Sequence, residues 1–434
     1  MAEILPLRAW RYNSNRLPDI EELTSPLFDV VTEKQRLALY QNPYNSIHLS
    51  VPAGKKPART AANLLEDWKA RDVLKQDPIP GIYVYYQQFT LPGSDKVYTR
   101  KGFICYIKAY DWSEEVLLRH ENTIPKAVND RLELLDKTQL NVSPTHGLYT
   151  DPHFELEKYM DESMLSPIYE SEDYQGVKDS LSVIHDAKVI QKFLEVLKDK
   201  QVILADGHHR YEGSLYYRKQ CSKANPRHTG LEAYNYHMMY LTNTEADDLR
   251  ILPTHRLVQG IQDFDPDELL EKLAPYFIIK PLDDPDDVNT IILGKQWAFG
   301  LLLKDNTYKI RLKPEVFEQL DWPMPKEIKA LDLTVLHYFV LEKTLGILGK
   351  DQRASEKISF ERNFATCLRK VITQEAQCAF IVKDISMEEV KHVCYSGYTM
   401  PQKSTFFYPK AICGYLFGSI KEDEFRLPDY FSLQ

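Results

Sequence analysis

Six consecutive residues near the middle of the chain, residues 205–210 (Ala-Asp-Gly-His-His-Arg), combine a carboxylate, two imidazoles and a guanidinium. They follow the apolar run 202–204, which predicts a short buried strand, and precede residues 211–218, whose spacing predicts a helix. A strand, a tight turn and a helix in this order direct backbone N–H groups and the positive end of the helix dipole to one point. Such a point attracts anions.

The side chains of this turn favour phosphate as the anion. Gly207 permits the sharp turn, and His208, His209 and Arg210 add donors beside the carboxylate of Asp206. Arginine binds phosphate oxygens in pairs, and histidine donates or transfers protons. The alternative is a surface turn whose histidines satisfy backbone carbonyls. The composition favours phosphate binding over this alternative, although a motif match is only a hypothesis.

A second cluster begins with His120 and Glu121, followed by Thr123, Lys126 and Arg131. A carboxylate beside a histidine, shortly before two basic residues, is typical of a general base next to an anion clamp. Taken alone, this cluster is better explained as a salt-bridged helix start.

A third cluster comprises Lys403, Ser404 and Thr405, with Lys410 nearby. Hydroxyls beside a lysine can hold phosphate, but the same residues also occur in ordinary loops. The glycine frames of a P-loop and of a dinucleotide-binding turn are missing, as is the Gly-x-Ser-x-Gly elbow of hydrolases. Asp29 has two interpretations, orienting a substrate or capping the helix that begins near Thr32. Capping is the commoner role of such an aspartate.

Composition excludes several classes of protein. The 434 residues suffice for two or three domains, and 43% of them are hydrophobic. With 63 acidic against 54 basic residues, a net charge of -9 argues against general nucleic-acid binding, although a local basic pocket is compatible with it. No apolar stretch approaches membrane-spanning length, and the N-terminal residues lack a signal-peptide pattern, so we expect a cytoplasmic protein without membrane contact.

Metal chemistry is not predicted from the residues. None of the six cysteines forms a Cys-x-x-Cys pair, and the twelve histidines show no ligand spacing. The Tyr- and Phe-rich strands leave two alternatives open, the interface of a homodimer or an internal core, and the core is favoured.

The elements that must position these clusters follow from periodicity and turn signals. Helices are predicted at 32–40, 58–75, 126–140, 187–198, 266–275, 331–345 and 386–394. Strands are predicted at 46–51, 81–90, 101–110, 116–118, 233–241, 276–280, 297–303, 307–312 and 377–382. Residues 141–180 are acidic and rich in turns. The chain is therefore expected to be an α+β protein with a domain at 1–257, a smaller α+β domain at 258–399, and a C-terminal segment at 400–434 that packs back.

The turn and its sequence context resemble a known family. Residues 205–211 are similar to the signature of the prokaryotic family labelled domain of unknown function 1015. Further matching segments lie at 26–30, 42–45, 120–123 with Lys126 and Arg131, and 400–410. The resemblance extends nearly from end to end, and the order of the segments is specific.

A second resemblance concerns mechanism. A Gly-x-His-Arg turn after a strand is similar to the nucleotide-phosphate turn of the ParB/sulfiredoxin-like fold, some members of which phosphorylate free L-serine with a glutamate as base. This resemblance implies a ParB/sulfiredoxin-like mixed α/β core and two cofactors, ATP or ADP and Mg²⁺. The chain departs from the pattern at His208, where sulfiredoxin has cysteine, and in its additional C-terminal unit.

The same resemblance assigns roles. Glu121 would be the base, with Asp206 and His208 completing the catalytic group, and Asp29 and His120 would contact the substrate. The phosphates would be held by the remaining residues of the three clusters: Gly207, His209, Arg210, Lys126, Arg131, Lys403, Ser404, Thr405 and Lys410.

The sequence therefore predicts a nucleotide-dependent kinase of a small hydroxylated metabolite, with L-serine as the first candidate. Two alternatives stay open. One is a phosphoester hydrolase that acts on phosphoserine-like substrates, and the other is a non-catalytic regulator that binds a nucleotide or phosphometabolite.

Overall fold

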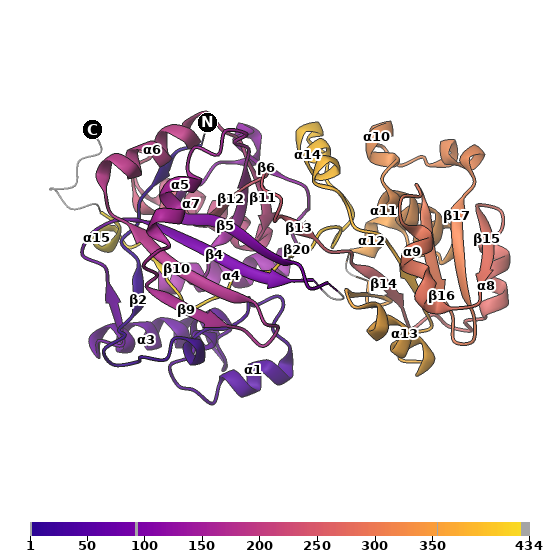
Figure 1. Cartoon of the computed structure of the whole chain (residues 1–434), viewed down its shortest axis with the longest axis horizontal. Coiled ribbons are helices and arrows are strands. Elements are labelled where there is room, and N and C mark those ends of the chain that lie inside the picture. The colour runs from indigo at the N-terminus through magenta and orange to yellow at the C-terminus, as the bar shows by residue number, and fades with distance from the viewer. Residues whose placement is uncertain (1, 92–93, 354, 427–434) are drawn as a thin grey trace. The chain divides into compact units, whose positions relative to one another are not determined.

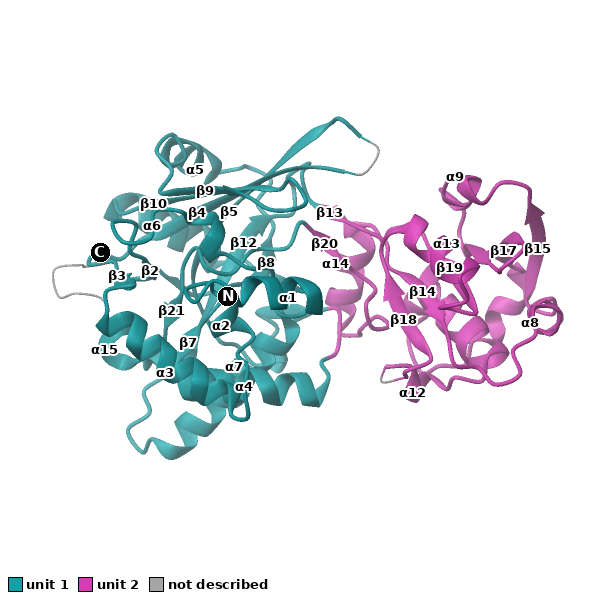
Figure 2. Ribbon diagram, turned by 90° about the horizontal axis from the view of Figure 1, so that it is seen from below, with its two compact units in different colours: residues 1–119, 123–249, 409–434 teal, residues 120–122, 250–408 magenta. Residues whose placement is uncertain are grey.

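The computed structural model describes residues 2–91, 94–353 and 355–426 and divides the chain into two units (Figures 1 and 2). Unit 1 comprises residues 1–119, 123–249 and 409–434, and unit 2 comprises residues 120–122 and 250–408. The sequence analysis placed the boundaries at 257/258 and 399/400. The last part of the chain returns to unit 1, so each unit is built from segments that are far apart in sequence.

A nine-stranded mixed sheet forms the centre of unit 1. Its order is β6-β11-β8-β12-β5-β4-β10-β9, with β1 paired to β5. The pairs β11–β6 and β12–β8 are parallel, and the other pairs are antiparallel. The strands are β1 (Ile4–Leu5), β4 (Ile82–Thr90), β5 (Val97–Lys108), β6 (Leu117–Arg119), β8 (Thr145–Tyr149), β9 (Tyr169–Glu172), β10 (Lys178–Ile184), β11 (Val202–Asp206) and β12 (Tyr236–Asn243).

The helices of unit 1 lie on both faces of this sheet, and two short strand pairs complete the unit. The helices are α1 (Glu33–Leu39), α2 (Ile47–Ser50), α3 (Pro57–Ala70), α4 (Pro125–Thr138), α5 (Glu157–Ser163), α6 (Ala187–Lys198), α7 (His208–Ala224) and α15 (Glu422–Phe425). The short pairs are β2 (Trp10–Tyr12) with β3 (Leu74–Gln76), and β7 (Leu140–Asn141) with β21 (Gly418–Ser419).

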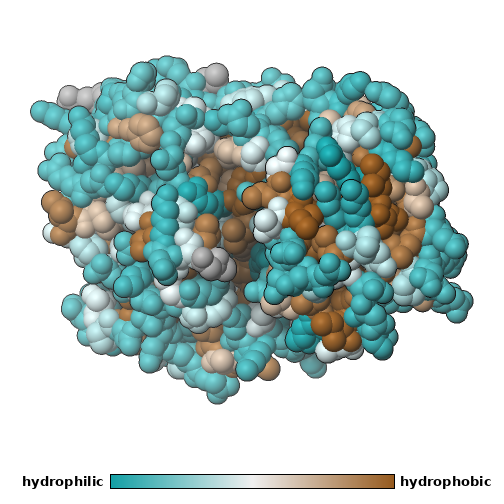
Figure 3. Space-filling view, turned by 45° about the vertical axis from the view of Figure 1, so that its right-hand side comes forward, coloured by the Kyte–Doolittle hydropathy of each residue, from teal (hydrophilic) through white to brown (hydrophobic). Residues whose placement is uncertain are grey.

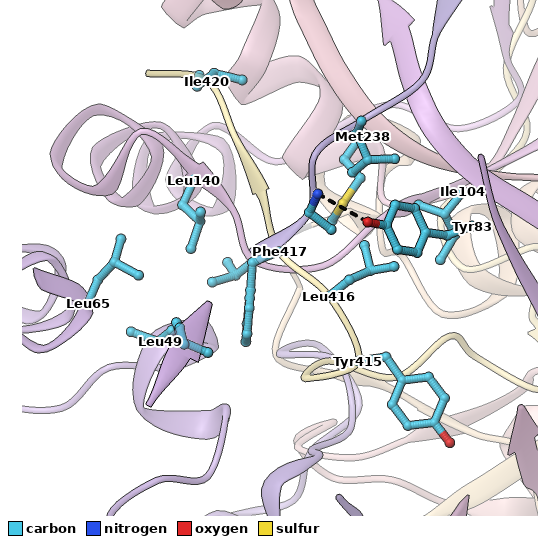
Figure 4. Close-up of a cluster of buried hydrophobic side chains, with 14 of the residues drawn as sticks. Leu49, Leu65, Tyr83, Ile104, Leu140, Met238, Tyr415, Leu416, Phe417 and Ile420 are labelled. Atoms are coloured by element: carbon cyan, nitrogen blue, oxygen red, sulfur yellow. Dashed lines mark hydrogen bonds between the residues drawn. The ribbon is translucent and has the colours of Figure 1, made fainter. Parts of the chain in front are cut away.

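Coverage on both faces explains why β4 is a nearly continuous run of buried residues. Tyr83 and Tyr85 belong to the core that includes side chains of α3 and α4, whereas Ile82 and Val84 belong to the core that includes α5 and α6. Figure 4 shows part of the first core, where Leu416 and Phe417 of the C-terminal segment lie among the sheet and helix side chains. The prediction that the aromatic strands form a core is confirmed.

Unit 2 contains a six-stranded antiparallel sheet in the order β15-β17-β16-β19-β14-β18. Its two faces are covered by separate cores, one with α8 and the helical segment 332–344, the other with α9 and α13. The strands are β14 (His255–Val258), β15 (Phe277–Leu282), β16 (Ala298–Leu302), β17 (Thr307–Leu312), β18 (Ile358–Glu361) and β19 (Cys378–Ile381), and β13 (Arg250–Ile251) pairs with β20 (Phe407–Tyr408). The helices are α8 (Pro266–Leu273), α9 (Val288–Ile292), α10 (Lys326–Lys329), α11 (Asp332–Val335), α12 (Gly349–Gln352), α13 (Phe364–Ile372) and α14 (Met387–Ser396).

The predicted α+β class, with a large mixed sheet and a second, smaller unit, is confirmed. The predicted strand at 46–51 is wrong, because α2 occupies these residues. The Asn45 side chain accepts a hydrogen bond from the Ile47 amide at 2.9 Å and so starts a helical turn. The predicted helix at 58–75 ends at Ala70, and the one at 331–345 consists of α11 followed by the π-helical segment 336–344.

The surface is mostly hydrophilic on the face that Figure 3 shows, with apolar residues in smaller areas among polar ones. Single exposed apolar side chains such as Leu165 and Leu231 are ordinary on a globular protein. Among the described residues, no helix has both the length and the apolar character needed to cross a membrane.

The predicted strand, turn and helix around residue 207 are present as β11, Gly207 and α7. Gly207 is the N-cap of α7 and has a φ of +91°. A Cβ atom at this position would lie 2.5 Å from the Cγ2 atom of Thr145, so neither the conformation nor the space admits a side chain.

We expect Gly207→Ala to lower the free energy of unfolding by about 1–3 kcal/mol, because it adds a steric clash to the strain of a positive φ. Urea unfolding measures the change. Gly230→Ala is the matched control, since Gly230 has a φ of +89° but has no atom of the described structure within 4 Å of the added Cβ. Equal losses for the two variants would contradict the contribution of the clash.

Candidate functional site

An ion cluster lies where β11 turns into α7. Asp206 binds two cations, Arg210 through its Oδ2 atom at 2.9 Å and Lys410 through its Oδ1 atom. The Nη1 atom of Arg210 also donates to the hydroxyl of Ser143 at 2.8 Å and to the carbonyl of Pro144 at 2.7 Å. The three charged side chains are almost completely buried. We call Asp206, Arg210 and Lys410 the ion cluster.

A β-bulge directs Asp206 to this position. In the pairing of β11 with β8, Leu204 lies opposite Gly147 and Asp206 lies opposite His146, so β11 has one extra residue between these pairs. The bulge turns Asp206 to the face that His146 occupies, where Lys410 lies as well. Without the extra residue, Asp206 would face the same core as Leu204.

The electrostatics of the cluster keep Asp206 ionised. Burial by itself would raise the pKa of Asp206, but the positive charges of Lys410 and Arg210 outweigh it and hold the pKa below its usual range. Gly207 provides no side-chain cap, so the amide groups of the first turn of α7 receive no side-chain acceptor at the N-cap. The site therefore combines a helix N-terminus with two buried cations.

The ion cluster is one end of a row of polar side chains across the sheet. We call His146, Arg100, Gln87 and Asp179, together with Asp206, the polar row. Gln87 lies opposite both Arg100 and Asp179, while His146 lies opposite Asp206 and its ring stacks on Tyr240 with centroids 5.0 Å apart. The row is buried along its whole length.

The C-terminal segment of unit 1 is held along this row by hydrogen bonds. The Arg100 guanidinium donates to the carbonyl of Pro409 and to the side-chain oxygen of Gln87, whose amide donates to the carbonyl of Lys410 at 3.0 Å. The same amide donates to the Asp179 carboxylate at 2.8 Å. Backbone contacts at residues 409 and 410 therefore place the Lys410 side chain at Asp206.

Two charged groups of the polar row have unused hydrogen-bonding atoms. Within the described part of the chain, the Nε and Nη1 atoms of Arg100 and the Oδ2 atom of Asp179 have no partner. Burial raises the pKa of Asp179 to about 7, although hydrogen bonds from Tyr85 and Gln87 oppose this shift. Buried polar atoms of this kind are rare in proteins, and they accompany bound water, ions or ligands.

The other predicted residues of unit 1 have structural contacts. The His209 Nε2 atom accepts a hydrogen bond from the Ile124 amide at 3.0 Å, at the start of α4. Arg131 donates to the carbonyl of Ser50 at 2.7 Å and pairs with Asp130. His208 is buried in the first turn of α7. Lys126 and Asp29 are exposed, the former in the first turn of α4 and the latter in the turn before α1.

Asp29 is not the cap of α1. Thr32 is its N-cap, and its side chain and that of Gln35 form a reciprocal capping box. The prediction of a helix that starts at Thr32 is confirmed, whereas the aspartate two residues before the cap takes no part in it.

His120 and Glu121 belong to unit 2, together with Lys403, Ser404 and Thr405. The His120 Nε2 atom and the Thr405 hydroxyl lie 2.7 Å apart, and the Lys403 amide donates to the Glu121 Oε1 atom at 3.3 Å. The Ser404 hydroxyl donates to the carbonyl of Pro401. The second and third clusters of the sequence analysis therefore meet within unit 2.

Arg256, which is completely buried in unit 2, holds this meeting point. It donates to the carbonyls of Thr254, Gln402 and Lys403 and to the His337 Nε2 atom at 3.1 Å. Burial lowers the pKa of Arg256 to about 9, and the charge of Glu121 opposes this shift. Sequence reasoning treated this arginine as part of a capped strand end and missed its contacts.

The structure thus brings the predicted site residues together in two groups. Asp206, Arg210 and Lys410 meet in unit 1, and His120, Glu121 and residues 403–405 meet in unit 2. Sequence reasoning missed Arg100, Gln87 and Asp179, although a charged residue at 100 and a glutamine at 87 inside aromatic strands are visible signals. In the described ranges, no three His, Cys, Asp or Glu side chains are arranged to hold a metal ion.

We expect Asp206→Asn to lower the free energy of unfolding by about 3–5 kcal/mol, because it leaves two buried cations without their shared carboxylate. Urea unfolding at pH 7 measures this loss. The double variant Asp206→Asn/Lys410→Met should recover part of it, since one of the two cations is then absent.

Asp67→Asn is the matched control for this variant. Asp67 also pairs with an arginine four residues later, Arg71, but the pair is exposed, so little change is expected. A loss at Asp67 as large as that at Asp206 would show that burial does not determine the effect.

Buried histidines in unit 1 predict a pH dependence of stability. Burial lowers the pKa of His237 to about 3 and that of His146 well below its usual value. Between pH 6.5 and about 3 the unfolded chain binds a proton at His237 that the folded chain does not, so unfolding becomes easier as the pH falls. The expected contribution is about 1.4 kcal/mol per pH unit within this window.

The variant His237→Gln should flatten this dependence while it retains partners for Ser214 and Thr145, which the ring contacts at 2.8 and 3.0 Å. Urea unfolding at pH 7, 6 and 5 gives the slope. His153→Gln, at an exposed position, should leave the slope unchanged. A slope that is the same in the native chain and His237→Gln would rule out the assignment.

Comparison with known proteins gives one family and several distant structural likenesses. No curated protein matches the chain. Among solved structures, a free serine kinase mutant in complex with AMP is 14% identical, covers 74% of this chain and 94% of its own, and has a TM-score of 0.39. A conserved hypothetical protein from Pyrococcus furiosus is 13% identical, with coverages of 74% and 97% and a TM-score of 0.38.

A C-terminally truncated SbnI from Staphylococcus aureus is 12% identical, with coverages of 72% and 85% and a TM-score of 0.35. Likenesses of this degree assign no activity. The family described as "Protein of unknown function (DUF1015)" matches residues 4–334, which is most of the chain. The prediction of this family from the turn at 205–211 is thereby confirmed, and the chain belongs to the DUF1015 family.

Proposed function

We propose that this protein is a nucleotide-dependent kinase that phosphorylates a small hydroxylated metabolite, with free L-serine as the first candidate. The observation that supports the proposal is the convergence of Arg210 and Lys410 on Asp206 at the glycine-capped N-terminus of α7. Phosphoryl transfer requires mainly positioning and neutralisation of charge, and these groups supply both.

The geometry suits phosphate better than other anions. The first-turn amides of α7 and the positive end of its dipole point in one direction, as in known phosphate sites. Arg210 and Lys410 add a planar guanidinium and a point charge at the same turn, and burial strengthens their attraction for an anion. The Nε atom of Arg210 has no partner within the described residues, so this guanidinium retains an unused donor.

Each residue has a role in the proposed reaction. The acceptor hydroxyl loses its proton to a base, its oxygen forms a bond to the terminal phosphorus, and the bond between that phosphorus and the leaving nucleotide breaks. Arg210 and Lys410 neutralise the charge on the transferring group, while Asp206 holds both cations in place. Glu121 is the proposed base, a role that the resemblance to free serine kinases implies and that the Glu121 variant below tests.

The residues of the ion cluster fit a nucleotide phosphate but do not provide a protein site for Mg²⁺. Both carboxylate oxygens of Asp206 are bound by cations, and a metal ion at the same oxygens would repel them. We therefore assign no step to a protein-bound metal. ATP and ADP have the same terminal phosphate chemistry, so the geometry is compatible with either donor.

The hydrolase alternative is less well supported. It requires His208 or His209 as acid or nucleophile, but the Nε2 atom of His209 accepts the Ile124 amide and His208 is buried in α7. The non-catalytic regulator uses the same ion cluster and differs only in the absence of turnover.

A phosphorylation assay tests the proposal. The protein is incubated with Mg²⁺, ATP or ADP and a panel of hydroxylated metabolites that includes L-serine, and phosphorus NMR detects new phosphomonoesters. Lys410→Gln should lower kcat/KM about 100-fold, the usual effect of losing one electrostatic contact to the transition state. Lys192→Gln, which removes a lysine of the exposed pair with Glu155, should retain full activity.

Glu121→Gln separates catalysis from binding. It should abolish turnover and leave nucleotide affinity unchanged, as measured by calorimetry. Nucleotide binding without a product in the native protein would favour the regulator, and release of inorganic phosphate from phosphoserine would favour the hydrolase. Full activity of Glu121→Gln would refute the role of Glu121 as base.

A further inference from the structure

A small internal cavity of unit 1 lies next to the ion cluster but on other atoms of Arg210. Its volume is about 30 Å³, and its lining comes from α4, β7, the segment after β7, α7 and β12. Leucine and valine side chains supply its apolar wall. Its polar wall consists of Arg131, Asn141, Ser143, Arg210, Ser214 and His237.

Two of these residues have hydrogen-bond donors without an acceptor. The Nε atom of Arg210 and the Nδ2 atom of Asn141 are buried and have no partner in the described part of the chain. Both residues are more than nine-tenths buried, at 9% and 6% exposure. A buried donor without an acceptor costs about 1–3 kcal/mol, so two donors at one cavity call for an occupant that accepts hydrogen bonds.

The other polar groups of the wall already have partners. The Ser143 hydroxyl accepts from Arg210 Nη1, and the Ser214 hydroxyl contacts the Nδ1 atom of His237 at 2.8 Å. Arg131 is bound to the carbonyl of Ser50 and to Asp130. The unsatisfied atoms are thus both donors, and two arginines contribute positive charge to the wall.

We infer that this cavity is a binding site for one compact monovalent anion, held between Arg210 Nε and Asn141 Nδ2. The charge follows from two arginines in the wall, and the small size follows from the volume, which admits a halide or a single carboxylate group. The occupant is either a free ion or the carboxylate group of a small acid. The inference is independent of the proposed kinase activity, because it rests on the cavity and its donors.

Crystals of the native protein in sodium bromide give a direct test. We expect an anomalous bromine peak within hydrogen-bonding distance of both nitrogen atoms. Loss of the peak when L-serine is added, with a carboxylate in its place, identifies the acid as the source of the anion. Persistence of the peak identifies a free ion. A cavity that contains only water, or nothing, under both conditions overturns the inference.

Asn141→Asp tests the site in solution, because it places a carboxylate next to Arg210 and so supplies the anion from the protein. The Tm of the native protein should rise with bromide at constant ionic strength, since a ligand of the folded state stabilises it. The Tm of Asn141→Asp should not respond. Asn225→Asp, which changes charge equally at a half-buried helix end, should respond like the native protein.

The outcomes of the solution test are distinct. Equal bromide responses of the native protein and Asn141→Asp overturn the site, as does a native protein that shows no response. If Asn141→Asp fails to fold, Asn141→Ala removes the same donor without adding charge and should weaken the bromide response at least tenfold in concentration. Failure of the proposed kinase activity leaves these expectations unchanged, because no nucleotide takes part in either measurement.

Discussion

Lys410 and Asp206 are separated by 204 residues in sequence, and their ion pair connects the C-terminal segment of unit 1 to the turn between β11 and α7. Arg210 binds the other oxygen of the same carboxylate, so one acidic side chain orders two cations. Because all three groups are buried, the removal of one leaves the others uncompensated. The geometry of the turn therefore depends on a segment that the chain adds only after unit 2.

The polar row extends this dependence across the sheet. Arg100 and Gln87 hold the carbonyls of residues 409 and 410, and these backbone contacts determine where the Lys410 side chain lies. A buried network of this kind is costly when it is incompletely satisfied, and the unused atoms of Arg100 and Asp179 mark where it is incomplete. The aromatic core on the same face, with Leu416 and Phe417, adds the apolar burial that offsets this cost.

Local signals in the sequence predicted local structure well. The helix at 187–198 has the bounds of α6, because its apolar periodicity and its Asp186 cap agree. The strand-turn-helix at 202–218 was found because Gly207 and the apolar run are adjacent. The strand predicted at 46–51 was wrong because the Asn45 side chain, rather than the β propensity of the segment, determines its conformation.

Contacts between distant segments were beyond these signals. Lys410 was identified as a cation of interest, but nothing in its own neighbourhood indicates Asp206 as its partner. The bulge that aims Asp206 is one extra residue in a ladder, which is visible only once β8 is paired. In the same way, the cluster at 403–405 was assigned to phosphate, whereas its contacts to His120, Glu121 and Arg256 arise from the pairing of segments within unit 2.

The ion cluster also constrains how an anion can bind. Asp206 and an incoming phosphate are both acceptors for Arg210 and Lys410, so the affinity for phosphate equals the gain from the new contacts minus any loss at Asp206. The pKa of Asp206 is held low, which means that protonation does not remove this competition near neutral pH. A phosphate that uses the first-turn amides of α7 and the unused Nε atom of Arg210 avoids most of the loss, whereas one that displaces Asp206 must exchange one buried ion pair for another. Tight binding therefore favours a ligand that adds to the cluster and leaves the Asp206 contacts in place.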